Sequence, residues 1–192
     1  LLLEAGYRVR AFLVGNREKM TPDALAMEEK LKTAGGELEA LDLEDQRTAA
    51  WLSTCDCFVD ALFGVGLKRP LTGEFLAVVR WMNARRTPVV SCDLPSGVDG
   101  DTGEILGDAV QAKVTVTFTC AKPGLYLGEG ASCAGLVTVA DIGIPHRLIF
   151  GPGAQMRFPV GVMGYEDVVL PRRKRDSHKG DYGRVLILAG SV

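Results

Sequence analysis

Residues 89–103 constrain the fold most, because a short apolar run leads there directly into a turn crowded with polar groups. The run 89–92 is β-branched and apolar on both faces, which is typical of a strand buried in a parallel sheet. Asp93 follows at once, and Pro95 and two glycines then prevent regular structure. Ligands of open α/β sheets bind beyond the carboxyl ends of strands. The pattern therefore predicts that Asp93 lies at the rim of the core, where its surroundings can tune a carboxylate.

Strand and helix patterns alternate along the rest of the chain. Strands are expected at residues 7–14, 37–41, 57–62, 113–119 and 136–140. Helices are expected at residues 21–34, 45–53 and 73–84. Thr21 has the residue type of an N-cap, and Pro22 fits the first helical position. This order predicts an α/β fold with a doubly wound, mostly parallel sheet in a Rossmann-like three-layer αβα arrangement.

Composition limits the class of protein. The chain has 192 residues, 47% of them hydrophobic, which is enough for one domain and part of a second. Its net charge of -2 favours neither nucleic acid nor a membrane surface as a partner. Cys92 and Cys120, two of the five cysteines, fall in apolar strand patterns, so a reducing, cytoplasmic compartment is expected. No apolar run approaches the ~20 residues of a transmembrane helix.

The two ends of the chain suggest a piece of a longer protein. Residues 1–6 resemble the last turn of a helix, and residues 184–192 resemble a strand entering a turn. Between residues 151 and 176 the composition shifts to Gly, Pro and basic residues, which predicts a linker. The expected organisation is a first domain at 1–150, a linker at 151–176 and the start of a second domain at 177–192.

Asp60 is a lone carboxylate near the end of a strand that should be buried. An unpaired buried carboxylate is costly, so it requires a cation, hydrogen-bond donors or water. A hard cation held by oxygen ligands would satisfy it. The alternative is that Asp60 caps a nearby loop or accepts backbone N–H bonds. The segment alone leaves both interpretations open.

The loop after this strand could bind an anion. It consists of Gly64, Val65, Gly66, Leu67, Lys68, Arg69 and Pro70. Its glycines let backbone N–H groups approach an anion, Lys68 and Arg69 add positive charge, and the helix beginning near Gly73 points its positive end the same way. Because Arg69 replaces the third glycine, the loop is not a dinucleotide-binding fingerprint. The simpler alternative is a tight turn with a solvated basic edge.

Further candidate residues follow the central strand. If the strands are neighbours, Asp60 and Asp93 end at the same rim. Ser96 has neither a nucleophile-elbow pattern nor a nearby histidine, which disfavours a serine hydrolase. Lys122 could reach a phosphate, pair with a carboxylate at the rim, or simply be solvated.

Four segments together resemble one known family. They are residues 59–73, 93–99, 122–125 and 139–145. In this order they resemble the NAD(P)H-hydrate epimerase domain of the YjeF N-terminal type. Residues 177–191 resemble the entrance of the ADP- or ATP-dependent NAD(P)H-hydrate dehydratase domain. The order of the two is that of the bifunctional NAD(P)H-hydrate repair enzymes.

The resemblance implies an isomerase that interconverts the R and S forms of hydrated NADH and NADPH (NADHX and NADPHX), fused to a truncated lyase. It implies a potassium ion held by Asp60 and Ser96, and a substrate whose phosphate-bearing part is wrapped by residues 64–70. Asp93 matches the family's substrate-contacting aspartate and is our choice for acid–base work. The missing dehydratase part would use ADP or ATP, with magnesium as an option. A homo-oligomer is compatible with these expectations.

One departure from the family matters. Its Asn-Asn-Gly-Gly-Asp loop, which supplies a further potassium ligand, should precede Leu1 and is absent. A chain without this loop is expected to lack part of its site and could be inactive. Two other functions stay open. One is a nucleotide- or RNA-binding module of the same fold without turnover. The other is a small-molecule kinase, although residues 1–150 contain no P-loop.

Overall fold

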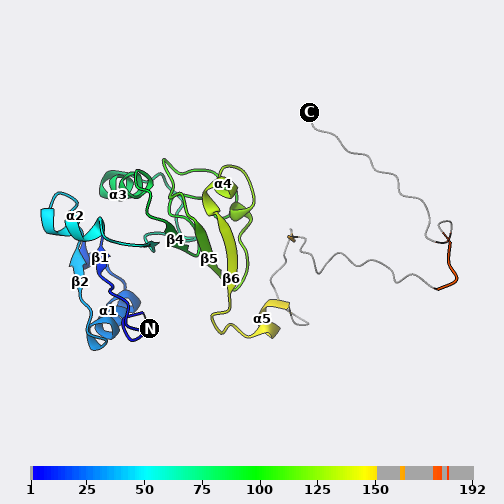
Figure 1. Cartoon of the computed structure of the whole chain (residues 1–192), viewed down its shortest axis with the longest axis horizontal. Helices are drawn as coiled ribbons and strands as arrows, with labels where there is room; N and C mark the ends of the chain where they lie inside the picture. Colours follow the sequence, from blue (N-terminus) through cyan, green and yellow to red (C-terminus); the bar gives the residue numbers. More distant parts are fainter. Residues whose placement is uncertain (1, 151–160, 163–174, 179–180, 182–192) are drawn as a thin grey trace. The chain divides into compact units, whose positions relative to one another are not determined.

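The computed structural model describes residues 2–150, 161–162, 175–178 and 181. The chain divides into two compact units, Leu1–Gln155 and Met156–Val192, and almost all of the described residues belong to the first (Figure 1). The expected linker and the expected start of a second domain fall almost wholly outside the described residues and stay predictions. None of the helices in the described part of the chain is both long and apolar enough to cross a membrane.

The main sheet of the first unit has four parallel strands. In spatial order they are β3 (Phe58–Asp60), β4 (Val89–Cys92), β5 (Val114–Phe118) and β6 (Leu136–Ala140). The register pairs Asp60 with Ser91 and Cys92 with Val116. Because every pair is parallel, the carboxyl ends of all four strands meet at one edge of the sheet. The prediction of a parallel α/β fold is confirmed.

A second, two-stranded parallel sheet consists of β1 (Ala11–Leu13) and β2 (Leu38–Ala40). Figure 1 shows this pair apart from β4, β5 and β6. The sequence predicts one continuous sheet, whereas no ladder joins β1 to β3 among the described residues. Contact is made instead by side chains: Phe12 packs against the core, with its ring 6.2 Å from that of Trp51 in an edge-on arrangement. Hydrophobic burial does not require strand pairing, so the pattern alone could not reveal the break.

Helices connect the strands largely as predicted. They are α1 (Pro22–Thr33), α2 (Gln46–Leu52), α3 (Gly73–Asn83), α4 (Gly130–Ala134) and α5 (His146–Phe150), with short 3₁₀ helices at Arg17–Lys19 and Pro123–Leu125. The Thr21 hydroxyl accepts a hydrogen bond from the Ala24 N–H at 3.2 Å, and the Asp45 carboxylate accepts one from the Thr48 N–H at 2.7 Å. Both are side-chain N-caps of the expected kind.

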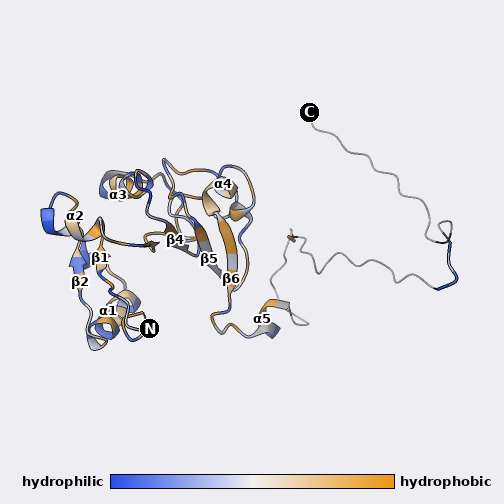
Figure 2. Cartoon of the chain, in the orientation of Figure 1, coloured by the Kyte–Doolittle hydropathy of each residue, from blue (hydrophilic) through white to orange (hydrophobic). Residues whose placement is uncertain are grey.

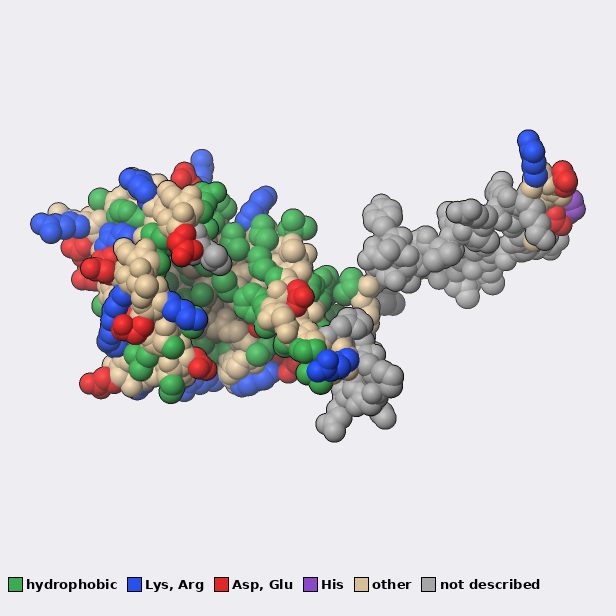
Figure 3. Space-filling model, turned by 90° about the horizontal axis from the view of Figure 1, so that it is seen from below, with side chains coloured by type: hydrophobic (Ala, Val, Ile, Leu, Met, Phe, Trp, Pro, Cys, Tyr) green, Lys and Arg blue, Asp and Glu red, His purple; other side chains and the backbone are tan. Residues whose placement is uncertain are grey.

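Helix α3 packs against the first residues of β3 and β4. Val79 is fully buried, and Val78 and Met82 join it in the core that also contains Phe58 of β3 and Val89 of β4. Figure 2 shows β6 mainly in the hydrophobic colour, whereas α3 carries both hydrophobic and hydrophilic residues. In Figure 3 one face of the first unit has hydrophobic side chains at its centre, with charged side chains of both signs beside them. Helix α3 begins three residues after the 64–70 loop, and Leu67 of that loop is buried in the same core.

Candidate functional site

Asp60 ends β3 with its carboxylate buried, since only 1% of the residue is exposed. One carboxylate oxygen accepts hydrogen bonds from the Ser96 hydroxyl (2.6 Å) and the Leu62 N–H (3.3 Å). The other accepts them from the Ser91 hydroxyl and the Ser96 N–H, both at 2.8 Å. The sheet register supplies the first of these two donors, because Ser91 is the β4 partner of Asp60. These four donors compensate the cost of burying the charge.

Ser96 ties the ends of β3 and β4 together. Its hydroxyl accepts a hydrogen bond from the Phe63 N–H at 2.9 Å and lies 3.3 Å from the Phe63 carbonyl oxygen. A carboxylate, a hydroxyl and a carbonyl oxygen therefore converge at one partly buried point, with one negative charge among them. This oxygen set fits a hard monovalent cation, which would replace the hydrogen bond between Ser96 and Asp60. The described residues contain no cluster of three His, Cys, Asp or Glu side chains that would suit a transition metal.

Asp93 lies at the end of the neighbouring strand β4, with a left-handed backbone at φ 71°. One of its carboxylate oxygens, Oδ1, accepts hydrogen bonds from the Lys122 ammonium (2.5 Å), the Phe118 N–H (3.1 Å) and the Thr117 hydroxyl (3.2 Å). The other, Oδ2, faces the glycine loop: a Cβ atom added to Gly64 would lie 3.4 Å from it. Asp60, Asp93 and the start of the loop thus meet at one rim, as the sequence predicts.

Lys122 pairs with a carboxylate at this rim, which is one of the alternatives that the sequence leaves open. Its ammonium group also donates to the Thr117 hydroxyl at 3.0 Å and to the Phe118 carbonyl at 2.8 Å. The two charged side chains are largely buried, with 19% of Lys122 and 15% of Asp93 exposed. All three ammonium hydrogens therefore have acceptors within the protein.

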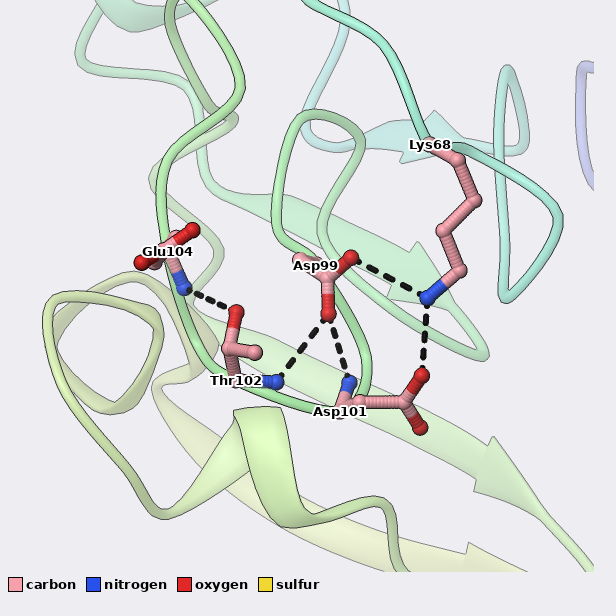
Figure 4. Close-up of polar contacts among 5 residues, drawn as sticks. All are labelled: Lys68, Asp99, Asp101, Thr102 and Glu104. Carbon is pink, nitrogen blue, oxygen red and sulfur yellow. Dashed lines mark hydrogen bonds and ion pairs between the residues drawn. The ribbon is translucent and has the colours of Figure 1, made fainter.

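The basic edge of the 64–70 loop is partly neutralised. Figure 4 shows the Lys68 ammonium between two carboxylates, 3.1 Å from Asp99 and 2.8 Å from Asp101. The sequence predicts free positive charge here, and the structure differs because the turn that follows the central strand brings its carboxylates to the same rim. The sequence contains one indication of this pairing: the loops that follow the neighbouring strands β3 and β4 carry opposite charges.

Asp99 also closes its own turn. Its other oxygen accepts the N–H groups of Asp101 (2.9 Å) and Thr102 (3.0 Å). These two backbone hydrogen bonds, followed by the one from Lys68, lower the pKa of Asp99 from its ordinary 3.8 to about 2. The pairing with both carboxylates raises the pKa of Lys68. This ion cluster links the two rim loops.

The remaining loop residues divide into anchors and exposed groups. Leu67 is buried in the core, so only its backbone could contact a ligand. Val65, Arg69 and Pro70 are exposed, and Gly66 has open space where a Cβ atom would be. Exposed backbone beside two glycines suits the close approach of an anion.

Two threonines at the end of β5 were not singled out in the sequence. Thr117 bridges Asp93 and Lys122. Thr119 has a left-handed backbone at φ 65°, and its buried hydroxyl has no hydrogen-bond partner among the described residues. In the sequence, only the alternation of Thr with Val and Phe over 113–119 points to these threonines. This alternation does not indicate which threonine lies at the rim.

Comparison with known proteins gives a consistent result. Residues 1–124 match the family model described as "YjeF-related protein N-terminus". The chain is 40% identical over 191 residues to the bifunctional NAD(P)H-hydrate repair enzyme Nnr of Thermofilum pendens, covering 99% of this chain and 35% of that relative. It is 40% identical over 136 residues to the NAD(P)H-hydrate epimerase of Oenococcus oeni, covering 71% of this chain and 61% of that relative. The chain therefore spans about a third of the length of the bifunctional relative.

A solved structure supports the fold. The crystal structure of yeast ynu0 matches with a TM-score of 0.61 and 24% sequence identity, over 88% of this chain and 68% of that chain. At this identity the match bears on the fold alone.

Proposed function

The chain belongs to the family of YjeF-related protein N-termini, and on that premise we propose that it is the NAD(P)H-hydrate epimerase part of the protein that contains it. The reaction is the interconversion of the R and S epimers of hydrated NADH and NADPH. The observation that carries the proposal is the Asp93 carboxylate, with one oxygen held by three donors and the other facing Gly64. The names of the epimerase relatives support the same activity.

The chemistry needs one group that can both take and return a proton. The hydrated nicotinamide ring is a hemiaminal, in which one carbon carries both the hydroxyl and the ring nitrogen. Oδ2 of Asp93 takes the hydroxyl proton as the carbon–oxygen double bond forms and the carbon–nitrogen bond breaks, and the nitrogen then receives that proton. Reversal of these steps on the other face of the carbonyl closes the ring with inverted configuration. General acid–base catalysis by one positioned carboxylate is sufficient for such transfers.

Potassium is the cation that we propose for the rim. Asp60 and Ser96 would hold it, and it would supply a fixed positive charge beside the bound nucleotide. The carboxylate and hydroxyl oxygens that meet there support this assignment. Residues 64–70 would contact the phosphate-bearing part of the substrate, mainly through backbone N–H groups, because Lys68 is already paired.

The proposal extends to the wider protein. The resemblance of residues 177–191 to a dehydratase entrance, and the names of the bifunctional relatives, support a fused lyase that uses ADP or ATP, with magnesium as an option. Five free cysteines are consistent with the expected reducing, cytoplasmic compartment.

The direct test starts from NADHX enriched in its R epimer. The natural protein that contains this chain is added with potassium, and the R-to-S ratio is followed by chromatography that resolves the epimers. Relaxation to the equilibrium ratio at a rate proportional to protein concentration supports the proposal. Relaxation at the rate without protein overturns it, and nucleotide binding in that case favours the non-catalytic binding module instead.

A further inference from the structure

Backbone strain marks the ends of two neighbouring strands. Asp93 after β4 and Thr119 after β5 are the non-glycine residues with positive φ in the described part of the chain. Left-handed backbone is less costly for aspartate than for most side chains and is uncommon for threonine. At Asp93 the backbone N–H donates to the Val116 carbonyl at 2.8 Å, and the side chain is held by further hydrogen bonds.

The two oxygens of Asp93 differ sharply in their surroundings. Oδ1 accepts three hydrogen bonds, from Lys122, Phe118 and Thr117. No donor in the described part of the chain contacts Oδ2, which faces Gly64. A carboxylate held in this way presents only one oxygen to a reacting group.

Lys122 is itself held by the chain around it. It precedes the 3₁₀ helix Pro123–Leu125, whose Gly124 donates its N–H to the Gly100 carbonyl at 2.8 Å. A Cβ atom on Gly124 would lie 2.1 Å from the Asp99 carbonyl oxygen, so the backbone approach requires glycine. The ammonium already has three acceptors, including Oδ1 of Asp93. This lysine therefore has no hydrogen left for a substrate phosphate.

From this geometry we propose that Lys122 is a positioning residue for the epimerisation, and that with Thr117 it fixes Asp93 so that Oδ2 alone faces the reacting atoms. The inference rests on the proposed function. It adds that the lysine acts through Asp93 and makes no contact with the substrate. Its removal should therefore impair the chemical step far more than substrate binding.

The test compares Lys122→Met with wild type in the natural protein that contains this chain. Loss of orientation at the reacting group should lower kcat by about 10- to 100-fold and change KM by less than about 3-fold. Lys113→Met is the matched control, because Lys113 is exposed and lies just before β5, at its opposite end. An unchanged kcat, or a rise in KM alone, would overturn the proposal.

A second variant and a second measurement keep the test decisive. If Lys122→Met does not fold, Thr117→Val serves as the second variant. It removes one donor to Oδ1 of Asp93 and one acceptor of the Lys122 ammonium at nearly constant side-chain volume. It should lower kcat by roughly 3- to 10-fold with KM unchanged. A crystal structure of either folded variant should show Asp93 turned from its wild-type orientation. Retention of that orientation would refute the positioning role. Absence of epimerisation in wild type would instead refute the proposed function, and the crystal structure would then test only whether Lys122 orients Asp93.

Discussion

The Asp60 carboxylate and the Ser96 hydroxyl lie 2.6 Å apart, although 36 residues separate them along the chain. The contact joins the end of β3 to the turn after β4, and the Ser96 N–H adds a second hydrogen bond to the same carboxylate. One pair of residues thus links the two strand ends, and it would provide two of the oxygens of the proposed cation site.

Removal of either serine hydroxyl should destabilise the fold. Ser91→Ala and Ser96→Ala each take one donor from the buried Asp60 carboxylate, so each should lower the free energy of unfolding by about 1–3 kcal/mol. Chemical denaturation at constant pH measures the free energy of unfolding of each variant. If wild type and both variants are equally stable, water replaces the lost hydrogen bond to the Asp60 carboxylate.

The serine variants, together with Asp60→Ala, separate stability from cation binding. Asp60→Ala and Ser96→Ala should shift or abolish the potassium dependence of epimerisation. Ser91→Ala should keep it, because the Ser91 hydroxyl bonds Oδ2 of Asp60, whereas the Ser96 hydroxyl lies against Oδ1. Initial rates over a potassium titration, with sodium keeping the ionic strength constant, provide the measurement. An unchanged potassium response in Asp60→Ala would remove Asp60 from the proposed cation site.

Acid should weaken the rim through Asp99. Its pKa is about 2 in the folded protein and near 3.8 when unperturbed, so the stability that it contributes is fully present above pH 4 and is lost as the pH falls toward 2. Asp99→Asn should therefore lose less stability than wild type over that range. Thermal melts at pH 5, 4, 3 and 2 test this. Parallel curves for the two proteins would show that Asp99 does not contribute.

Gly64→Ala should interfere with the space in front of Asp93 without unfolding the protein. The backbone of Gly64 is not left-handed, and the new methyl group would make an ordinary contact of 3.4 Å with Oδ2. We expect an unchanged melting temperature and a fall in kcat/KM of about tenfold or more, because a displacement of about 1 Å can cost as much as 100-fold. If kcat/KM stays at the wild-type value, substrate does not approach Oδ2 from this side.

Local chemistry explains what the sequence could predict about the fold. Thr21 and Asp45 have side chains that cap helices, and the apolar runs of β3 and β4 each end at an aspartate. The sequence does not predict helix α4, because its residues, Gly-Ala-Ser-Cys-Ala, have neither an amphipathic period nor a strong cap. Nor does it predict the break between β1 and β3, because hydrophobic patterns do not specify hydrogen-bonded neighbours.

The site was predictable where strand order decided it. Parallel neighbouring strands bring Asp60 and Asp93 to one rim, and the loop after β3 must then start beside them. The partners of Lys68 and Lys122 depend on how two long, flexible side chains fold back over loops. The paired residues are some 30 positions apart and lie in different loops, so no pattern of sequence spacing predicts their ion pairs. Only the structure reveals them.

The rate of R-to-S conversion in Asp93→Asn tests the central claim most directly. The substitution keeps the size of the side chain and removes the basic oxygen, so epimerisation of NADHX in the natural protein that contains this chain should fall by at least ~100-fold while the fold persists. Near-normal conversion by a folded Asp93→Asn protein would contradict the account.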